Sequence, residues 1–315
     1  MVRWALGLLG VVLVAGGTYL FGLYSYSHNL WPVPLIRGIL FGDNEAQRFR
    51  GTFGEAGRLI AYPGKTEVKC PAPGPDTAVV LAIGQSNIAN QGENRFTSHY
   101  HGAVVNFFEG KCYRAESPLL GATAEEGEFL TLLGDRLVDD GAYKNVVILT
   151  SAVGGSEIAR WRKGGALNGP MLHALTGLLP GYRVTQVLWV QGEADYAIGT
   201  PPQVYTDDFQ SLLDTLTDGG VTAPVFIAIA TRCVGKWKPD NPIAAAQRAL
   251  VDDRRVFLGA DTDALIGTAD RRPDGCHFGG RGQVKAADAF VAAIEKVKAG
   301  ATRFAAPSTS ARPGH

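Results

Sequence analysis

The sequence predicts an α/β domain in which helices cover both sides of a mainly parallel sheet, giving a three-layer α/β/α sandwich. Four short apolar runs carry this prediction, and they begin at Thr77, Asn145, Val184 and Ala223. Unbroken apolar runs of this length are typical of strands that are buried on both faces. Helical patterns separate the runs, and strands that alternate with helices form right-handed βαβ units.

An apolar N-terminal segment precedes this domain. Residues 4–24 carry no charge, and as a helix they would extend roughly 30 Å, the thickness of a bilayer core. Arg3 precedes the segment and the next basic residues are His28 and Arg37, so the positive-inside rule places the rest of the chain outside the cytoplasm. We predict an uncleaved transmembrane signal anchor over residues 4–24, and a cleaved signal peptide is the alternative.

The segments on either side of the domain lack a regular pattern. Residues 25–75 contain the proline-rich stretches 31–34 and 71–75, which interrupt regular elements and predict an irregular stalk. The folded domain is expected over residues 76–304. Residues 305–315 have no apolar periodicity, so we predict a disordered tail there.

Helices and one further strand complete the predicted domain. Helical periodicity covers residues 125–140, 203–217, 242–253 and 282–299. In the first of these segments, Phe129, Leu133 and Leu137 fall on one face, as in a helix that packs on a sheet. A strand starting at Arg255 precedes the last helix.

The composition restricts the classes of function. Thirty basic residues balance thirty acidic ones, so the formal net charge is zero, which argues against nucleic-acid binding through a broad basic surface. A hydrophobic content of 46% with 19% charged residues excludes extended disorder as the main state.

The chain has four cysteines and no CxxC pair, so a zinc ribbon or a thioredoxin-like motif is not expected. An even count outside the cytoplasm allows disulfides, with three possible connectivities. We predict Cys70–Cys112 and Cys233–Cys276, because Cys233 follows a predicted strand and Cys276 lies in a late loop. Free buried thiols are the alternative.

Polar residues follow several predicted strands, at the edge where parallel sheets bind ligands. Ser86 follows the first strand, and Asp274 and His277 lie in a turn before the last helix. An aspartate three residues before a histidine can accept a hydrogen bond from one imidazole nitrogen, which leaves the other nitrogen to act as a base. These three residues predict a Ser-His-Asp triad.

Acyl transfer also needs hydrogen-bond donors for the oxyanion. The candidates are the backbone amide of Ser86, a backbone amide of the pair Gly154-Gly155, and the side-chain amide of Gln191. We expect no metal or organic cofactor. The HxH pair His99 and His101 has no third ligand nearby in sequence and is interpreted as part of a loop.

Four ordered motifs together resemble the sialate O-acetylesterase-like (SASA) branch of the SGNH hydrolases, which is related to carbohydrate esterase family 6. The motifs are GQSN at Gly84, the GGS(x)₄W-like stretch from Gly154 to Trp161, WVQGEAD at Trp189 and DGCHF at Asp274. The resemblance covers about residues 78–297. It implies a flavodoxin-like α/β/α fold and serine esterase activity on acetylated sugars.

This resemblance assigns roles residue by residue. Ser86 matches the family nucleophile, and Asp274 with His277 match the closing pair. Gly154 matches the glycine of the second motif, although Gly155 could take that part. Gln191 stands where many SGNH enzymes have asparagine. One departure from the family pattern is Cys276, which stands directly before His277. No glycine follows two residues after Ser86, which excludes the GxSxG elbow of α/β-hydrolases.

Further polar or aromatic residues near the motifs are predicted to bind substrate. They are Gln85, Asn87, Gly155, Trp161, Glu193 and Arg232. Trp161 could stack on a sugar ring or pack in the core, Glu193 could orient its loop instead, and Arg232 could form a surface ion pair.

The sequence therefore predicts a membrane-anchored, extracytoplasmic serine esterase that removes O-acetyl groups from a carbohydrate. If the N-terminal segment is cleaved, the protein would be secreted. The alternatives are an O-acyltransferase that uses the same triad and a non-catalytic carbohydrate-binding protein. The expected partners are an acetylated carbohydrate and the membrane, without nucleic acid, and the oligomeric state is left open.

Overall fold

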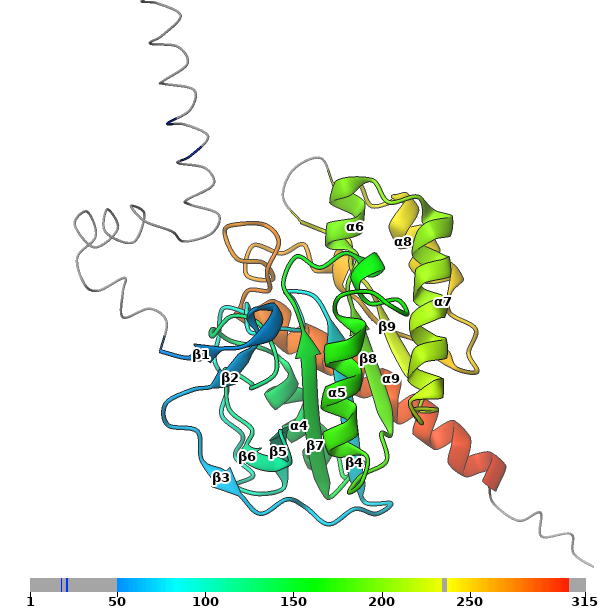
Figure 1. Cartoon of the computed structure of the whole chain (residues 1–315). Helices are drawn as coiled ribbons and strands as arrows, with labels where there is room; N and C mark the ends of the chain where they lie inside the picture. Colours follow the sequence, from blue (N-terminus) through cyan, green and yellow to red (C-terminus); the bar gives the residue numbers. More distant parts are fainter. Residues whose placement is uncertain (1–17, 19–20, 22–49, 234–236, 306–315) are drawn as a thin grey trace, which may run out of the picture. The chain divides into compact units, whose positions relative to one another are not determined.

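The computed structural model describes residues 18, 21, 50–233 and 237–305. An eight-stranded sheet with the order β10-β9-β8-β4-β7-β5-β6-β3 forms the centre of the domain (Figure 1). Its strands are β3 (Glu67–Val68), β4 (Thr77–Gly84), β5 (Val104–Phe108), β6 (Lys111–Arg114), β7 (Asn145–Ala152), β8 (Gln186–Val190), β9 (Val225–Ile229) and β10 (Val256–Asp261).

The sheet is mainly parallel. Neighbouring strands from β10 to β5 pair in parallel, whereas β6 and β3 extend the sheet by antiparallel pairing. The predicted α/β class with a mainly parallel sheet is therefore confirmed. The strands β3, β5 and β6 were not predicted from the apolar pattern.

Helices cover both faces of this sheet. They are α4 (Leu130–Asp139), α5 (Asn168–Leu178), α6 (Glu193–Ile198), α7 (Pro202–Asp218), α8 (Pro242–Ala249) and α9 (Gly280–Ala305). Short 3₁₀ turns cover Glu55–Gly57, Ile158–Arg160 and Thr262–Ala264. Figure 1 shows α5 and α7 in front of the sheet and α9 behind it.

The core forms two layers because side chains alternate across each strand. In β4, Val79 and Leu81 pack in the layer under α5, α7 and α8, while Val80 and Ala82 pack under α4 and α9 on the other face. Both sets are fully or almost fully buried. This double burial explains why β4 has an unbroken apolar sequence.

The first predicted helix begins later than its periodicity indicated. Residues 125–129 are not helical, and the Glu128 carboxylate accepts hydrogen bonds from the backbone N–H of Thr131 (2.8 Å) and from its hydroxyl (2.6 Å). This carboxylate satisfies a free N–H of the first turn, so α4 starts at Leu130.

The described part of the predicted stalk is more regular than expected. β1 (Thr52–Phe53) pairs with β2 (Leu59–Ala61), and β3 joins the edge of the main sheet. The disulfide Cys70–Cys112 fixes this segment to β6, with the two Cα atoms 5.2 Å apart. Backbone pairing and a covalent link, which apolar periodicity does not reveal, order these residues.

Both predicted disulfides are present, and the second joins Cys233 to Cys276. The predicted anchor over residues 4–24 lies, except for Thr18 and Phe21, outside the described residues, as does the tail after residue 305. No helix in the described residues has the length and hydrophobicity that a membrane span requires. α9 reaches Ala305, further than the predicted end at residue 299.

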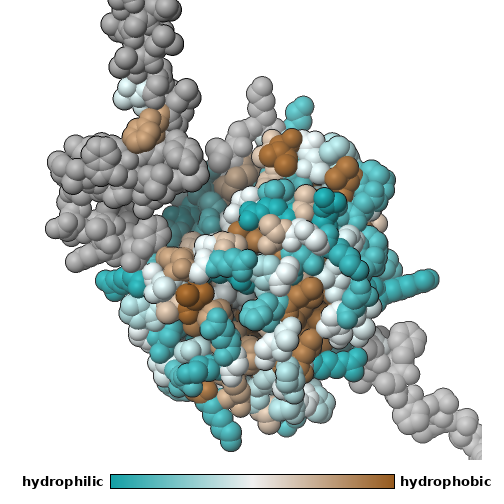
Figure 2. All heavy atoms as spheres, viewed as in Figure 1, coloured by the Kyte–Doolittle hydropathy of each residue, from teal (hydrophilic) through white to brown (hydrophobic). Residues whose placement is uncertain are grey.

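The surface of the domain carries separate apolar side chains. Ile198, Val204, Leu258 and Ile266 are exposed, and Figure 2 shows small hydrophobic areas divided by hydrophilic residues on the face in view. Scattered exposed apolar side chains are normal for a folded domain and indicate no partner by themselves.

Candidate active site

The first polar segment at the sheet edge follows β4. This strand ends at Gly84, and Gln85, Ser86 and Asn87 enter a turn. Gly84 has a φ of +136°, and a Cβ there would lie 2.1 Å from the carbonyl oxygen of Val190 in β8. Glycine is therefore required for the two strands to approach each other where Ser86 leaves the sheet.

Asp274 and His277 form a hydrogen-bonded pair in a turn before α9. Nδ1 of His277 lies 2.7 Å from Oδ2 of Asp274, and Oδ1 accepts from the backbone N–H groups of Cys276 (2.9 Å) and His277 (3.0 Å). Partial burial raises the pKa of the Asp274 carboxyl, but the hydrogen bond from His277 and those from the backbone outweigh it, so this pKa lies below its usual value. An ionised Asp274 can hold the imidazole with Nε2 left to accept a proton.

Asn87 connects the turn of Ser86 to the turn of His277. Its Oδ1 accepts from the backbone N–H of Phe278 (3.0 Å), and its Nδ2 donates to the carbonyl of Cys276 (3.2 Å). One side chain next to Ser86 thus binds the backbone on both sides of His277. These contacts place the turn of Ser86 next to the turn that carries Asp274 and His277.

Two buried ionisable side chains, Glu193 and Arg271, contact Asn87 and the His277 turn. Glu193 is 2% exposed, and its Oε1 accepts a hydrogen bond of 2.8 Å from Nδ2 of Asn87. Burial raises the pKa of the Glu193 carboxyl to about 7, although the Asn87 hydrogen bond and the charge of Arg271 act in the opposite direction. Arg271 donates from Nη1 to the carbonyl of Cys276 at 2.5 Å.

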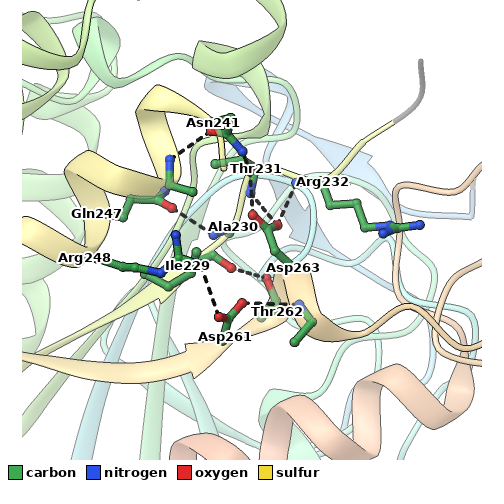
Figure 3. A network of polar contacts seen from close by, with 12 residues as sticks. Ile229, Ala230, Thr231, Arg232, Asn241, Gln247, Arg248, Asp261, Thr262 and Asp263 are labelled. Carbon is green, nitrogen blue, oxygen red and sulfur yellow. Dashed lines mark hydrogen bonds and ion pairs between the residues drawn. The ribbon is translucent and has the colours of Figure 1, made fainter. Parts of the chain in front are cut away.

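The end of β9 is held by a second buried carboxylate. Oδ1 of Asp263 accepts from the backbone N–H groups of Thr231 (2.8 Å) and Arg232 (2.7 Å), and Oδ2 accepts from the Thr231 hydroxyl. Figure 3 shows the side chain of Arg232 extending away from this network. The Arg232 guanidinium lies 4.6 Å from the centre of the Trp237 ring.

This strand end is covalently tied to the His277 turn. Cys233 follows Arg232 and forms the disulfide with Cys276, their Cα atoms 3.9 Å apart. Arg232 therefore lies near the candidate triad, and it makes no ion pair with the residues that the structure describes. Its placement is compatible with the predicted role in substrate binding and does not match a surface ion pair.

Backbone donors for an oxyanion are available at two places. In the described parts of the chain, the N–H groups of Ser86 and Gly155 have no hydrogen-bond acceptor. The N–H of Gly154 instead donates to the hydroxyl of Thr123 at 2.8 Å. Gly155, the predicted alternative to Gly154, therefore presents the free amide in this conformation.

Gln191 does not present a free donor, contrary to the expectation from sequence. Its Nε2 donates to the Asp195 carboxylate (2.5 Å) and to the Ser156 carbonyl (2.9 Å), and the side chain is fully buried. Both N–H bonds are occupied because the helix α6 and the loop after β7 close over it. Gln191 acts as a connection between these two segments.

Two further residues predicted to bind substrate are internal. Trp161 is fully buried, donates from Nε1 to Oγ of Ser156 (3.0 Å) and packs edge-on against Trp189, so the core alternative holds and sugar stacking does not. Oε1 of Gln85 accepts from the backbone N–H groups of Gly192 (3.3 Å) and Ala194 (3.2 Å). Gln85 therefore positions the loop after β8.

Within residues 50–233 and 237–305, no cluster of three or more His, Cys, Asp or Glu side chains is arranged to hold a metal ion. His99 instead contacts Asp135 and Asp139 on α4, at 3.0 and 3.1 Å.

Three residues near the site were not indicated by the sequence: Thr123, Arg271 and Asp263. Their positions depend on contacts between segments that are far apart in the chain.

Comparison with known proteins gives one family and several similar folds. Residues 76–296 match the family described as carbohydrate esterase, sialic acid-specific acetylesterase. A comparison with curated proteins gave no significant match.

Several solved structures have a similar fold. A protein from Arabidopsis thaliana is 18% identical, with a TM-score of 0.56 over 71% of this chain and 99% of its own. NanS is 16% identical, with a TM-score of 0.51 over 74% and 100%. A carbohydrate acetylesterase from Xanthomonas citri is 18% identical, with a TM-score of 0.51 over 71% and 56%. At these identities the likeness establishes the fold alone.

Proposed function

The chain belongs to the carbohydrate esterase family of sialic acid-specific acetylesterases, and from this premise we propose that it removes O-acetyl groups from a carbohydrate through a serine acyl-enzyme. Membership of this family makes the protein a carboxylic ester hydrolase. The four sequence motifs indicated the same class of enzyme. Its α/β/α domain is assigned to the flavodoxin-like SGNH fold, which the parallel sheet between two helical layers supports.

The first half-reaction transfers the acetyl group to Ser86. Its Oγ attacks the acetyl carbonyl carbon while Nε2 of His277 takes the hydroxyl proton, and Asp274 stabilises the imidazolium. The tetrahedral intermediate then breaks its bond to the sugar oxygen, and His277 gives the proton to that oxygen. The products are a free sugar hydroxyl and acetyl-Ser86.

The second half-reaction regenerates the enzyme. Water attacks the acetyl-serine, its proton passes to His277, and the bond to Ser86 Oγ breaks as that oxygen recovers the proton, which releases acetate. The free N–H groups of Ser86 and Gly155 are the donors assigned to the oxyanion in both steps. Gln191 is left out of this set because its amide hydrogens are already bound.

The observation that carries this proposal is the 2.7 Å Asp274–His277 pair, whose flanking residues are bound by the neighbour of Ser86. A panel of O-acetylated glycans, sialic acids included, should release acetate with the wild type. Ser86→Ala should lose at least about 10³-fold in rate and should fail to react with a fluorophosphonate probe. A near-wild-type rate in Ser86→Ala would refute the mechanism.

If the reaction forms an acetylated acceptor sugar in place of free acetate, the result would favour the O-acyltransferase alternative. A panel without turnover and an unlabelled Ser86 would favour a binding protein.

We also propose an extracytoplasmic location with an uncleaved anchor. The two disulfides support the location because such bonds persist in oxidising compartments. The mass of the mature protein tests the anchor, since a chain that begins after about residue 15 would identify a cleaved signal peptide.

A further inference from the structure

We propose that Glu193 is a positioning residue for this reaction: its carboxylate holds Asn87, and Asn87 holds the turn of His277 beside Ser86. The inference rests on the proposed function, because it assumes that Ser86 and His277 react together. The contacts of Asn87, the surroundings of Glu193 and the attachment of its backbone support it independently.

Both N–H groups and the oxygen of the Asn87 side-chain amide form hydrogen bonds. The backbone N–H of Phe278 must face its oxygen, and the carbonyl of Cys276 must face its nitrogen. The remaining N–H donates to Oε1 of Glu193 at 2.8 Å. Glu193 is thus the side-chain partner that fixes Asn87 from the β8 side, while the other two contacts hold the loop of His277.

The backbone around Glu193 is tied to the turn of Ser86 from the other side. The N–H groups of Gly192 and Ala194 both donate to Oε1 of Gln85. Gln85 and Asn87 flank Ser86, so the residues on both sides of the nucleophile contact the segment centred on Glu193. This segment therefore joins the flanks of Ser86 to the flanks of His277.

The backbone at Glu193 also has little freedom to move. Gly192 has a φ of +146°, and a Cβ there would lie 2.3 Å from Nε2 of Gln247 and 2.4 Å from the carbonyl of Ala230. Glu193 follows as the first residue of α6. A carboxylate on such a fixed backbone is a suitable anchor for Asn87.

The burial of Glu193 is difficult to explain by stability alone. Its Oε2 is buried and has no hydrogen-bond partner among the described residues. Burial raises the pKa of its carboxyl to about 7, so ionising it inside the fold costs free energy. The positive charge of Arg271 lowers the pKa of Glu193, whereas the negative charge of Asp263 raises it. The charge of Glu193 in turn raises the pKa of Tyr205. A contact that orients catalytic groups gives this costly residue a function.

The test compares two substitutions that differ in the hydrogen bond. Glu193→Ala removes the acceptor for Asn87, and a misplacement near 1 Å should lower kcat by about 10- to 100-fold. KM should stay unchanged because the Glu193 side chain is buried and its carboxylate contacts Asn87. Glu193→Gln keeps an acceptor oxygen, so its kcat should stay within about threefold of the wild type.

Asp135 offers a matched control. It is a buried carboxylate on α4 whose contacts among the described residues are with Ser98 and His99, and none is with the His277 turn. Asp135→Ala should lower the melting temperature without changing kcat of the folded protein. Circular dichroism confirms that each variant is folded at the assay temperature.

Two results would overturn the proposal: a wild-type kcat in folded Glu193→Ala, or equal losses in the Ala and Gln variants. If Glu193→Ala does not fold, Glu193→Asp replaces it, because the shorter side chain withdraws the acceptor and must also lower kcat. Ser86→Ala separates the two levels of inference. If it is inactive while Glu193→Ala has normal kcat, only the positioning role is wrong; if it is active, the proposed function is wrong.

Discussion

The raised pKa of Glu193 predicts a specific dependence of stability on pH. The pKa of this carboxyl is about 7 in the folded protein, compared with an ordinary value of 4.5. Between these values the folded protein retains a proton that the unfolded chain has released, so stability falls as pH rises through this range. At 1.36 kcal/mol per pH unit, the total loss is about 3 kcal/mol, complete above about pH 7.

Glu193→Gln should remove this dependence, because glutamine cannot ionise. We expect the free energy of unfolding of the variant, relative to the wild type, to rise by about 3 kcal/mol from about pH 4 to about pH 8. Urea unfolding with intact disulfides, measured at each pH unit, gives both curves. A difference between the two proteins that stays constant over this range would refute the assigned pKa and its cause.

Three further predictions concern the triad, a disulfide and a strand end. Asp274→Asn should lower the rate of acetate release by about 10³- to 10⁴-fold while the fold persists, and a loss below about tenfold would contradict its role in orienting the imidazole. Replacing Cys70 and Cys112 together by serine opens a loop of 42 residues and should lower the free energy of unfolding by about 4 kcal/mol; an accompanying loss of kcat would show that this distant bond also shapes the site. Gly84→Ala should destabilise the protein by about 3 kcal/mol, because its Cβ would meet the carbonyl of Val190, and an unchanged melting temperature would show that the strands can separate there.

The pairing of Asp274 with His277 could be predicted because it depends on local sequence. Asp274 and His277 are three residues apart in one turn, so their pairing needs no distant contact. Ser86 follows a strand that is buried along its whole length, and the carboxyl end of a parallel strand is where ligands bind in such sheets. The disulfide pairs were also predicted, although the residues left free thiols as an alternative.

The orientation of individual amide side chains could not be predicted. Gln191 has the residue type and the strand-end position of an oxyanion donor, yet Asp195 and Ser156 occupy its hydrogens. Asn87 was assigned to substrate, and its amide instead binds Glu193 and the backbone around His277. A primary amide turns toward whichever partners surround it, and those partners come from other parts of the chain.

The class of fold, the family and the Asp274–His277 pair could be predicted from the sequence, because apolar periodicity, strand-end motifs and a three-residue Asp–His spacing are local properties. Which of those side chains are buried and hydrogen-bonded inside the domain became visible only in the folded structure. Burial turned Trp161 and Gln191 into internal supports, and the convergence of β4, β8 and the last turn placed Glu193 between the flanks of Ser86 and His277. Desolvation and hydrogen-bond partnership depend on chain segments that meet only after folding, and these properties separate a reactive side chain from one that holds it in place.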